Sequence, residues 1–208
     1  MLSNNKTINL VKTSLRYNFH IGFQAKYLQL FAKKLMLGSR LKLSVINLTF
    51  FYYTFKNLMN TINFIFKLKF IPNFLIVLKQ NLLYDNYFYN LMEKNNKFKT
   101  KFNILDFFTL YYGKWLGGTI TNFKRLKILN NIPTLIIIND VLENIYVIRE
   151  SKNLKIPLIG LIDSNINPRV VDFPLVLNTK SKKATIFIFK LFATFIKSKS
   201  DLKKLLFY

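Results

Sequence analysis

Short runs of apolar residues alternate along the chain with longer segments in which apolar side chains recur every three or four positions. A run of about five apolar residues is typical of a strand buried on both faces of a sheet, and the longer spacing is typical of a helix covered on one side. The pattern predicts strands at residues 41–48, 74–78, 107–112, 135–138, 157–162 and 173–177, and helices at 49–67, 81–94, 121–129, 141–152 and 182–197. This alternation favours a three-layer α/β fold, with a mostly parallel sheet and helices on both faces.

No long linker or internal repeat divides the 208 residues, and that length suits one domain. We predict an N-terminal extension and basic arm at 1–40, a single α/β domain at 41–197 and a C-terminal tail at 198–208. Residues 94–101 (KNNKFKTK) are expected to form an exposed basic loop.

The charge balance indicates a polyanionic partner. The chain has 32 Lys and Arg against 9 Asp and Glu, a net charge of +23, so its compact state requires counter-charge. Nucleic acid phosphates or an anionic membrane surface could supply it, and composition does not separate the two. Hydrophobic residues make up 51% of the chain, which is far too many for a disordered basic tail.

The residue types in the chain exclude several kinds of site. With no Cys and the single His20, disulfides, thiolate metal sites and multi-histidine metal sites are excluded, and we expect no cofactor. The most apolar long window, 48–66, contains Lys56, Asn60 and Asn63 at helical spacing. We therefore interpret this window as an amphipathic helix and not as a membrane span.

Residues 114–123 (KWLGGTITNF) are the strongest candidate for a binding segment. A Gly-Gly pair allows close backbone approach, and a basic helix that begins on exposed N–H groups can bind phosphate. Trp115 could stack on a base, or it could anchor the turn in the core. The predicted RNA-contact residues of this segment are Lys114, Trp115, Thr121, Asn122, Lys124, Arg125 and Lys127, with Arg40, Asn165 and Arg169 as secondary candidates.

Acidic residues follow the predicted strands in the second half of the chain. They could form a metal or acid/base site, but the favoured interpretation is that Asp140 and Asp163 brace loops and that Glu150 pairs with Arg149 or Lys152. No nucleotide-binding glycine motif is present, and His20 has no plausible Ser/His/Asp set, so we predict that the chain is not an enzyme. The alternatives are an α/β enzyme that uses Asp140, Asp163 and Asn165, or a basic peripheral membrane protein.

Four segments resemble one family, the universal small-subunit ribosomal protein S-two in its bacterial and organellar form. Residues 114–123 resemble the family's RWLGGTLTN signature, and residues 139–157 resemble its run of D…E…A-x-x-E-A…L-x-I-P. Residues 160–168 (GLIDSNINP), continued by 172–174 (DFP), resemble its GIVDTNxxP loop, and residues 20–22 (HIG) match the start of its HFGH element. The resemblance implies a three-layer α/β fold and a structural role in the small ribosomal subunit. It also implies contacts with small-subunit rRNA and neighbouring ribosomal proteins, without catalysis, a small-molecule substrate or a membrane span.

The chain also departs from the family pattern. The long coiled-coil hairpin that follows the TN helix in bacterial relatives is lost or reduced here to one short helix, since residues 123–131 lead directly to the strand at 135–138. The family's second His is Phe23, and its acidic NDD corner is Asn178-Thr179-Lys180, which reverses the local charge. Abundant Lys, Asn, Ile, Phe and Tyr indicate an AT-rich organelle genome, so we expect a mitochondrial location, with the plastid as the less favoured one.

Overall fold

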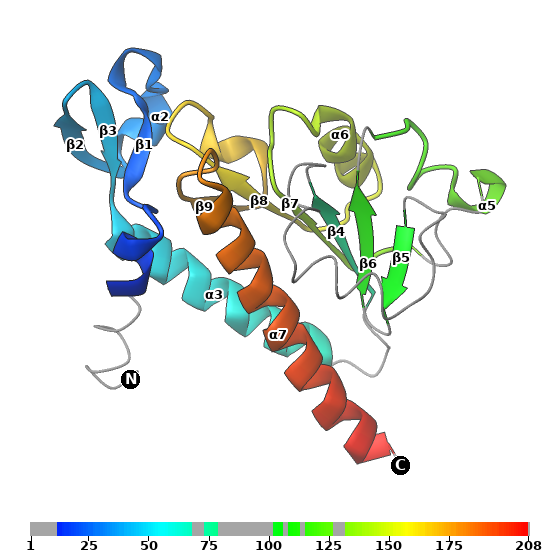
Figure 1. Ribbon diagram of the computed structural model, residues 1–208. Helices are drawn as coiled ribbons and strands as arrows, with labels where there is room; N and C mark the ends of the chain where they lie inside the picture. The colour runs from blue at the N-terminus through cyan, green and yellow to red at the C-terminus, as the bar shows by residue number, and fades with distance from the viewer. Residues whose placement is uncertain are drawn as a thin grey trace.

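A sheet with helices on both faces forms the body of the structure, which is a computed structural model (Figure 1). It describes residues 12–67, 73–78, 102–105, 108–112, 115–126 and 132–207. The helix predicted at 81–94 and the basic loop at 94–101 lie outside these ranges.

Within those ranges the main sheet has six strands in the order β5-β6-β4-β7-β8-β9. The neighbouring strands β6, β4, β7, β8 and β9 are parallel, and β5 pairs antiparallel with β6 at one edge. The strands are β4 (Phe74–Leu78), β5 (Phe102–Leu105), β6 (Phe108–Tyr112), β7 (Leu135–Ile138), β8 (Leu158–Ile162) and β9 (Phe173–Val176). The α/β prediction and five of its strands are confirmed, whereas β5 was not predicted.

Alternate residues of the parallel strands enter two separate cores. Ile76 and Ile137 pack with the long helices α3 (Leu48–Lys67) and α7 (Lys182–Phe207) on one face. Their neighbours in the strands pack with α6 (Ile145–Asn153) on the other face. Figure 1 shows α3 and α7 together below the sheet and α6 above it. Because both faces are covered, β4, β7 and β8 are buried along their whole length, as their continuous apolar runs indicated.

A second, smaller sheet lies beside the main one. Three antiparallel strands form it in the order β1-β3-β2, and the short helices η1 and α2 connect β1 to β2. The strand predicted at 41–48 is β3, which belongs to this small sheet. The elements are β1 (Ile21–Gln24), η1 (Ala25–Tyr27), α2 (Leu30–Lys33), β2 (Met36–Arg40) and β3 (Leu43–Ile46).

Several helix limits differ from the predictions. Helix α7 continues beyond Lys197 to Phe207, and α5 (Phe123–Leu126) has only four residues where residues 121–129 were expected to be helical. The proposed domain limits stay predictions. They fall in the turn between β2 and β3 and inside α7. In the part of the chain that the structure describes, no helix is long and apolar enough to cross a membrane.

Candidate nucleic-acid interface

The Glu150 carboxylate organises the turn that carries the Trp-Gly-Gly sequence. Its Oε1 accepts hydrogen bonds from the Trp115 indole Nε1–H at 3.0 Å and from the Gly118 backbone N–H at 2.8 Å. Its Oε2 accepts from the backbone N–H groups of Ile120 at 2.9 Å and Thr121 at 3.2 Å. Glu150 itself is buried on α6, so one carboxylate satisfies four donors of a segment about thirty residues away.

This geometry corrects one prediction and narrows another. Glu150 does not lie along the helix surface toward Arg149 or Lys152, because both of its oxygens point inward at the turn. The backbone N–H groups of Gly118, Ile120 and Thr121, in the turn before α5, already donate to a carboxylate. A phosphate at these three groups would have to displace a buried anion, so they are not the place where this segment binds phosphate.

Two roles were considered for Trp115, stacking on a base and anchoring the turn in the core, and the structure shows the second. Only 6% of the residue is exposed, and its ring packs edge-on against Tyr111 with the centroids 4.7 Å apart. Burial raises the pKa of the Tyr111 hydroxyl, which a backbone hydrogen bond to Leu116 partly offsets. The indole therefore fixes the turn to the sheet, and its face is not accessible to a base.

The polar side chains after the turn face outward. Thr121, Asn122 and Lys124 are exposed, and α5 begins at Phe123. Arg125 is a residue of α5, but its side chain is outside the described part of the structure. Lys114 and Lys127 are outside it altogether. The segment thus presents hydroxyl, amide and ammonium groups on a turn whose shape Glu150 and Trp115 fix.

The secondary candidates lie elsewhere. Arg40 is exposed at the end of β2, and Arg169 is exposed in η3 (Pro168–Val170), with its guanidinium carbon 4.2 Å from the centre of the Phe31 ring on α2. Figure 1 shows the small sheet and α5 at opposite ends of the molecule. The exposed candidates that the structure describes therefore lie on two surfaces, one around α5 and one beside the small sheet.

Asp163 braces the junction between the two sheets. It is 2% exposed, and its Oδ1 accepts from the backbone N–H groups of Ser164 at 2.6 Å and Phe23 at 3.1 Å. Burial raises the pKa of this carboxyl, and the hydrogen bonds from Ser164, Phe23 and Thr179 oppose that shift. The bracing role predicted for Asp163 is therefore confirmed.

Small residues allow this close approach. The Ser44 hydroxyl on β3 donates to the Ser164 hydroxyl at 2.8 Å and is buried with it. A side-chain carbon at Gly22 would lie 2.9 Å from the Ser164 oxygen and would also collide with Ser44. Gly22 is thus required by contact between the sheets. His20, two residues earlier, has a buried Nδ1 that no hydrogen bond satisfies.

A cavity of about 490 Å³ opens at the carboxyl ends of β7 and β8, beside the start of α7. Its polar lining mixes both charges, and its Asp140 and Asp163 carboxylates already accept backbone hydrogen bonds. Within the described ranges no group of three or more His, Cys, Asp or Glu side chains could hold a metal ion. The polar lining residues are Asn139, Asp140, Asp163, Asn165, Thr179, Lys180, Lys182 and Thr185.

Comparison with known proteins gives consistent matches. The family model described as ribosomal protein S2 matches residues 124–198. The chain is 26% identical over 190 residues to "Small ribosomal subunit protein uS2m" of Acanthamoeba castellanii, an alignment that covers 90% of this chain and 56% of that protein. It is 31% identical over 95 residues to uS2 of Mycoplasmopsis synoviae, which covers 46% of this chain and 32% of that protein.

A shorter match is to uS2c of Galdieria sulphuraria, at 34% identity over 56 residues, 27% of this chain and 24% of that protein. The chain spans little more than half the length of the first of these relatives. The matched residues 124–198 run from the start of α5 through β7, β8 and β9 into α7. They include Glu150 and Asp163, the two carboxylates that hold the turn and the junction between the sheets.

Proposed function

We propose that the chain is a member of the ribosomal protein S2 family and a structural constituent of the mitochondrial small ribosomal subunit. There it would bind small-subunit rRNA and neighbouring ribosomal proteins during mitochondrial translation. The observation that carries the proposal is the similarity to a uS2m protein over 90% of the chain, combined with a net charge of +23.

The mechanism is electrostatic and steric. Exposed Lys and Arg side chains neutralise phosphates whose mutual repulsion opposes compaction of folded RNA, and they release bound counterions as they do so. The buried α/β core supplies a rigid body that holds these cations in fixed positions. Family membership implies a structural role without catalysis, and hydrogen bonds from backbone N–H groups already occupy the cavity's two carboxylates.

We assign the main RNA contact to the side chains around α5. Thr121, Asn122 and Lys124 support this assignment because they are exposed on a turn of fixed shape. Lys114, Arg125 and Lys127 flank them in the sequence and complete the proposed patch. Trp115 contributes by positioning the turn, through its hydrogen bond to the buried carboxylate.

Arg40, Asn165 and Arg169 belong to a second proposed contact beside the small sheet. The Phe31 ring packs against the Arg169 guanidinium, whose N–H groups can donate two hydrogen bonds to one phosphate. Asn165 is half-buried at the rim of the cavity.

The mitochondrion is the location that we favour over the plastid. The relative that aligns with nine-tenths of this chain is a uS2m protein, whereas the uS2c relative matches about a quarter of it. The composition of the chain, rich in residues encoded by A and T, agrees with synthesis from an organelle genome.

Charge reversal around α5 tests the proposal. Lys124→Glu, Arg125→Glu and Lys127→Glu together should reduce co-sedimentation with small subunits in a sucrose gradient. They should also make the fall of log affinity for small-subunit rRNA with log salt shallower, by about two to three units of slope. The matched control reverses three exposed lysines of other elements, Lys12, Lys152 and Lys183.

The two variants carry the same net charge, so they separate a defined contact from bulk attraction. A defect in the α5 variant alone supports the patch. Equal defects would show that only total charge matters, and full co-sedimentation of the α5 variant would remove this segment from the interface.

A further inference from the structure

The hairpin formed by β2 and β3 displays aliphatic side chains to solvent. Leu37 on β2, Leu41 in the turn and Leu43 on β3 are 70%, 88% and 38% exposed. All three belong to one two-stranded unit: Leu41 lies in its turn, Leu43 is paired with Arg40, and Leu37 lies farther along β2. Three exposed leucines on one small element are characteristic of a surface that binds another molecule.

The turn of this hairpin has an unfavourable backbone for its sequence. Leu41 has φ of 50° and Lys42 has φ of 65°, and together they form the two-residue connection between Arg40 and Leu43. Two consecutive residues with positive φ define a type of turn for which Asn and Gly are strongly preferred. Leu41 gains almost no stabilisation from packing against the rest of the chain, since 88% of it is exposed. Strain of this kind is retained at sites of interaction.

Strand β2 is also an edge that can accept a further strand. It pairs with β3 on one side only, and its residues from Leu37 to Arg40 are exposed among the residues that the structure describes. An exposed edge presents backbone N–H and C=O groups to any extended segment that approaches it. The outer edge of the small sheet is therefore a template for strand addition.

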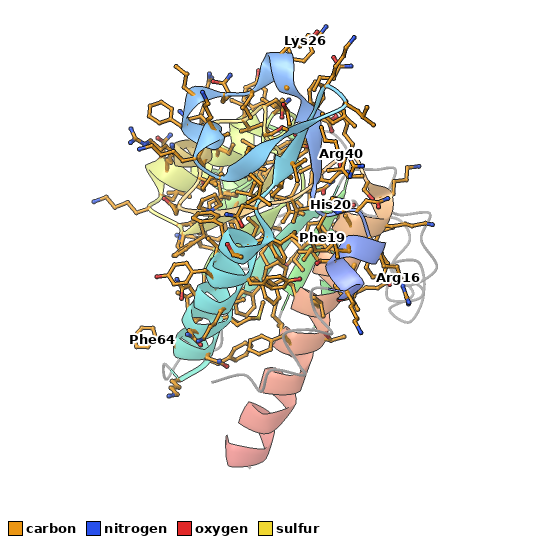
Figure 2. The ribbon with its side chains drawn as sticks, turned by 90° about the vertical axis from the view of Figure 1, so that its left-hand side faces the viewer. Arg16, Phe19, His20, Lys26, Arg40 and Phe64 are labelled. Carbon is orange, nitrogen blue, oxygen red and sulfur yellow. The ribbon has the colours of Figure 1, made fainter. Side chains whose placement is uncertain are left out.

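Cations surround this edge and indicate the charge of its partner. Arg40 and Lys42 lie on the hairpin itself, and Lys33 and Lys34 lie at the end of α2, shortly before β2 begins. The Ala25 N–H donates to the Lys42 carbonyl at 2.8 Å, which brings the neighbouring Lys26 to the same end of the sheet. Figure 2 shows Lys26 and Arg40 on this part of the molecule.

We propose that the β2–β3 hairpin is the docking site for an extended, acidic and aliphatic segment of a neighbouring protein. That segment pairs with the free edge of β2, receives the Leu41 side chain between its own aliphatic groups, and places carboxylates against the surrounding cations. RNA alone fits less well, because it has no extended peptide backbone that could pair with the free edge of β2. The inference rests on the proposed function, which places the chain in a particle with protein neighbours.

Zero-length carbodiimide cross-linking of purified mitochondrial small subunits provides the test. The reagent joins an amine to a carboxylate only when the two are in contact. We expect a cross-link from Lys42 to Asp or Glu in another protein, within a peptide that also contains aliphatic residues. Cross-links from Lys42 only to this chain's own carboxylates would overturn the proposal, as would ultraviolet cross-links of the hairpin to nucleotides alone.

Leu41→Asn separates docking from folding. Asn tolerates positive φ, so the melting temperature of the variant should be equal to or above that of the parent chain, while its Lys42 cross-link should weaken about tenfold. Leu154→Asn removes another exposed leucine, directly after α6, and should leave the cross-link unchanged. An undiminished cross-link in Leu41→Asn would refute the role of this side chain. Absence of the whole chain from the particles would instead defeat the proposed function, and this inference with it.

Discussion

Removal of the Glu150 carboxylate should destabilise the chain more than loss of any exposed ion pair. The carboxylate accepts four hydrogen bonds, and two of the donors, the Trp115 indole and the Ile120 N–H, belong to buried residues. A buried donor left without a partner costs about 1–3 kcal/mol, and a hydrogen bond to a charged group contributes about 1.5–3 kcal/mol. We therefore expect Glu150→Ala to lower the free energy of unfolding by about 3–5 kcal/mol, a large part of the stability of a domain.

The chain provides its own probe for this measurement. Trp115 is the single tryptophan, and its indole is a direct partner of the carboxylate. Urea unfolding followed by tryptophan fluorescence should show the midpoint of Glu150→Ala lowered by about 1.5–2.5 M, for a slope of about 2 kcal/mol per molar urea. The native emission should also shift to longer wavelength, because the freed indole N–H would find water.

Lys152→Ala is the matched control, since it removes an exposed side chain from the same helix and should change the free energy of unfolding by less than about 0.5 kcal/mol. Glu150→Gln should have an intermediate effect, because its amide nitrogen faces two N–H donors that its oxygen cannot reach. Glu150→Ala with the unfolding midpoint and emission spectrum of the parent chain would refute the assigned role of this carboxylate.

Three further predictions concern the junction and the charge. Gly22→Ala should lower the free energy of unfolding by about 1–3 kcal/mol in thermal melts, since its new carbon collides at the junction, whereas Gly117→Ala has open space and should be near neutral. The raised pKa of Asp163 means that its stabilising contribution is complete below pH 3.8 and is lost as the pH rises through its folded-state pKa. The stability of the parent chain relative to Asp163→Asn should therefore decline in urea titrations as the pH rises above 3.8, and a flat difference would contradict this. Affinity for rRNA should fall steeply with salt, by at least about tenfold between 50 and 200 mM, and salt-independent binding would exclude the electrostatic mechanism.

The main sheet was accessible from the sequence because its strands are buried on both faces. Leu135–Ile138 and Phe74–Leu78 are continuous apolar runs, and burial on both sides produces that pattern directly. The edge strand β5 was missed because Phe102–Leu105 (FNIL) contains a polar residue and follows a basic stretch. An edge strand needs less apolar sequence than a central one.

The same rules predicted only one strand of the small sheet, β3, and missed β1 and β2. The β2–β3 hairpin turns at Leu41-Lys42, where the expected Asn-Gly signal is absent, so no local feature marks the connection. The predicted end of α7 at Lys197 was too early. No Gly or Pro after Lys197 marks an end of the helix, and the helix continues to Phe207.

Glu150 shows why the candidate site was only partly predictable. Its helical neighbours in sequence are basic, which favoured a surface ion pair with Arg149 or Lys152. The partners that it has in the fold are backbone groups about thirty residues earlier, and backbone donors leave no signature in a single sequence. The segment at 114–123 was therefore correctly singled out, while the reason for its shape was not accessible.

Quantitative mass spectrometry of purified mitochondrial small subunits tests the central claim most directly. After a wash in high salt that strips loosely bound basic proteins, the account predicts this chain at about one copy per particle, equal to established small-subunit proteins. RNase treatment should then release it together with rRNA fragments. A chain that is absent from washed particles, and that is recovered instead free of RNA, would contradict the account.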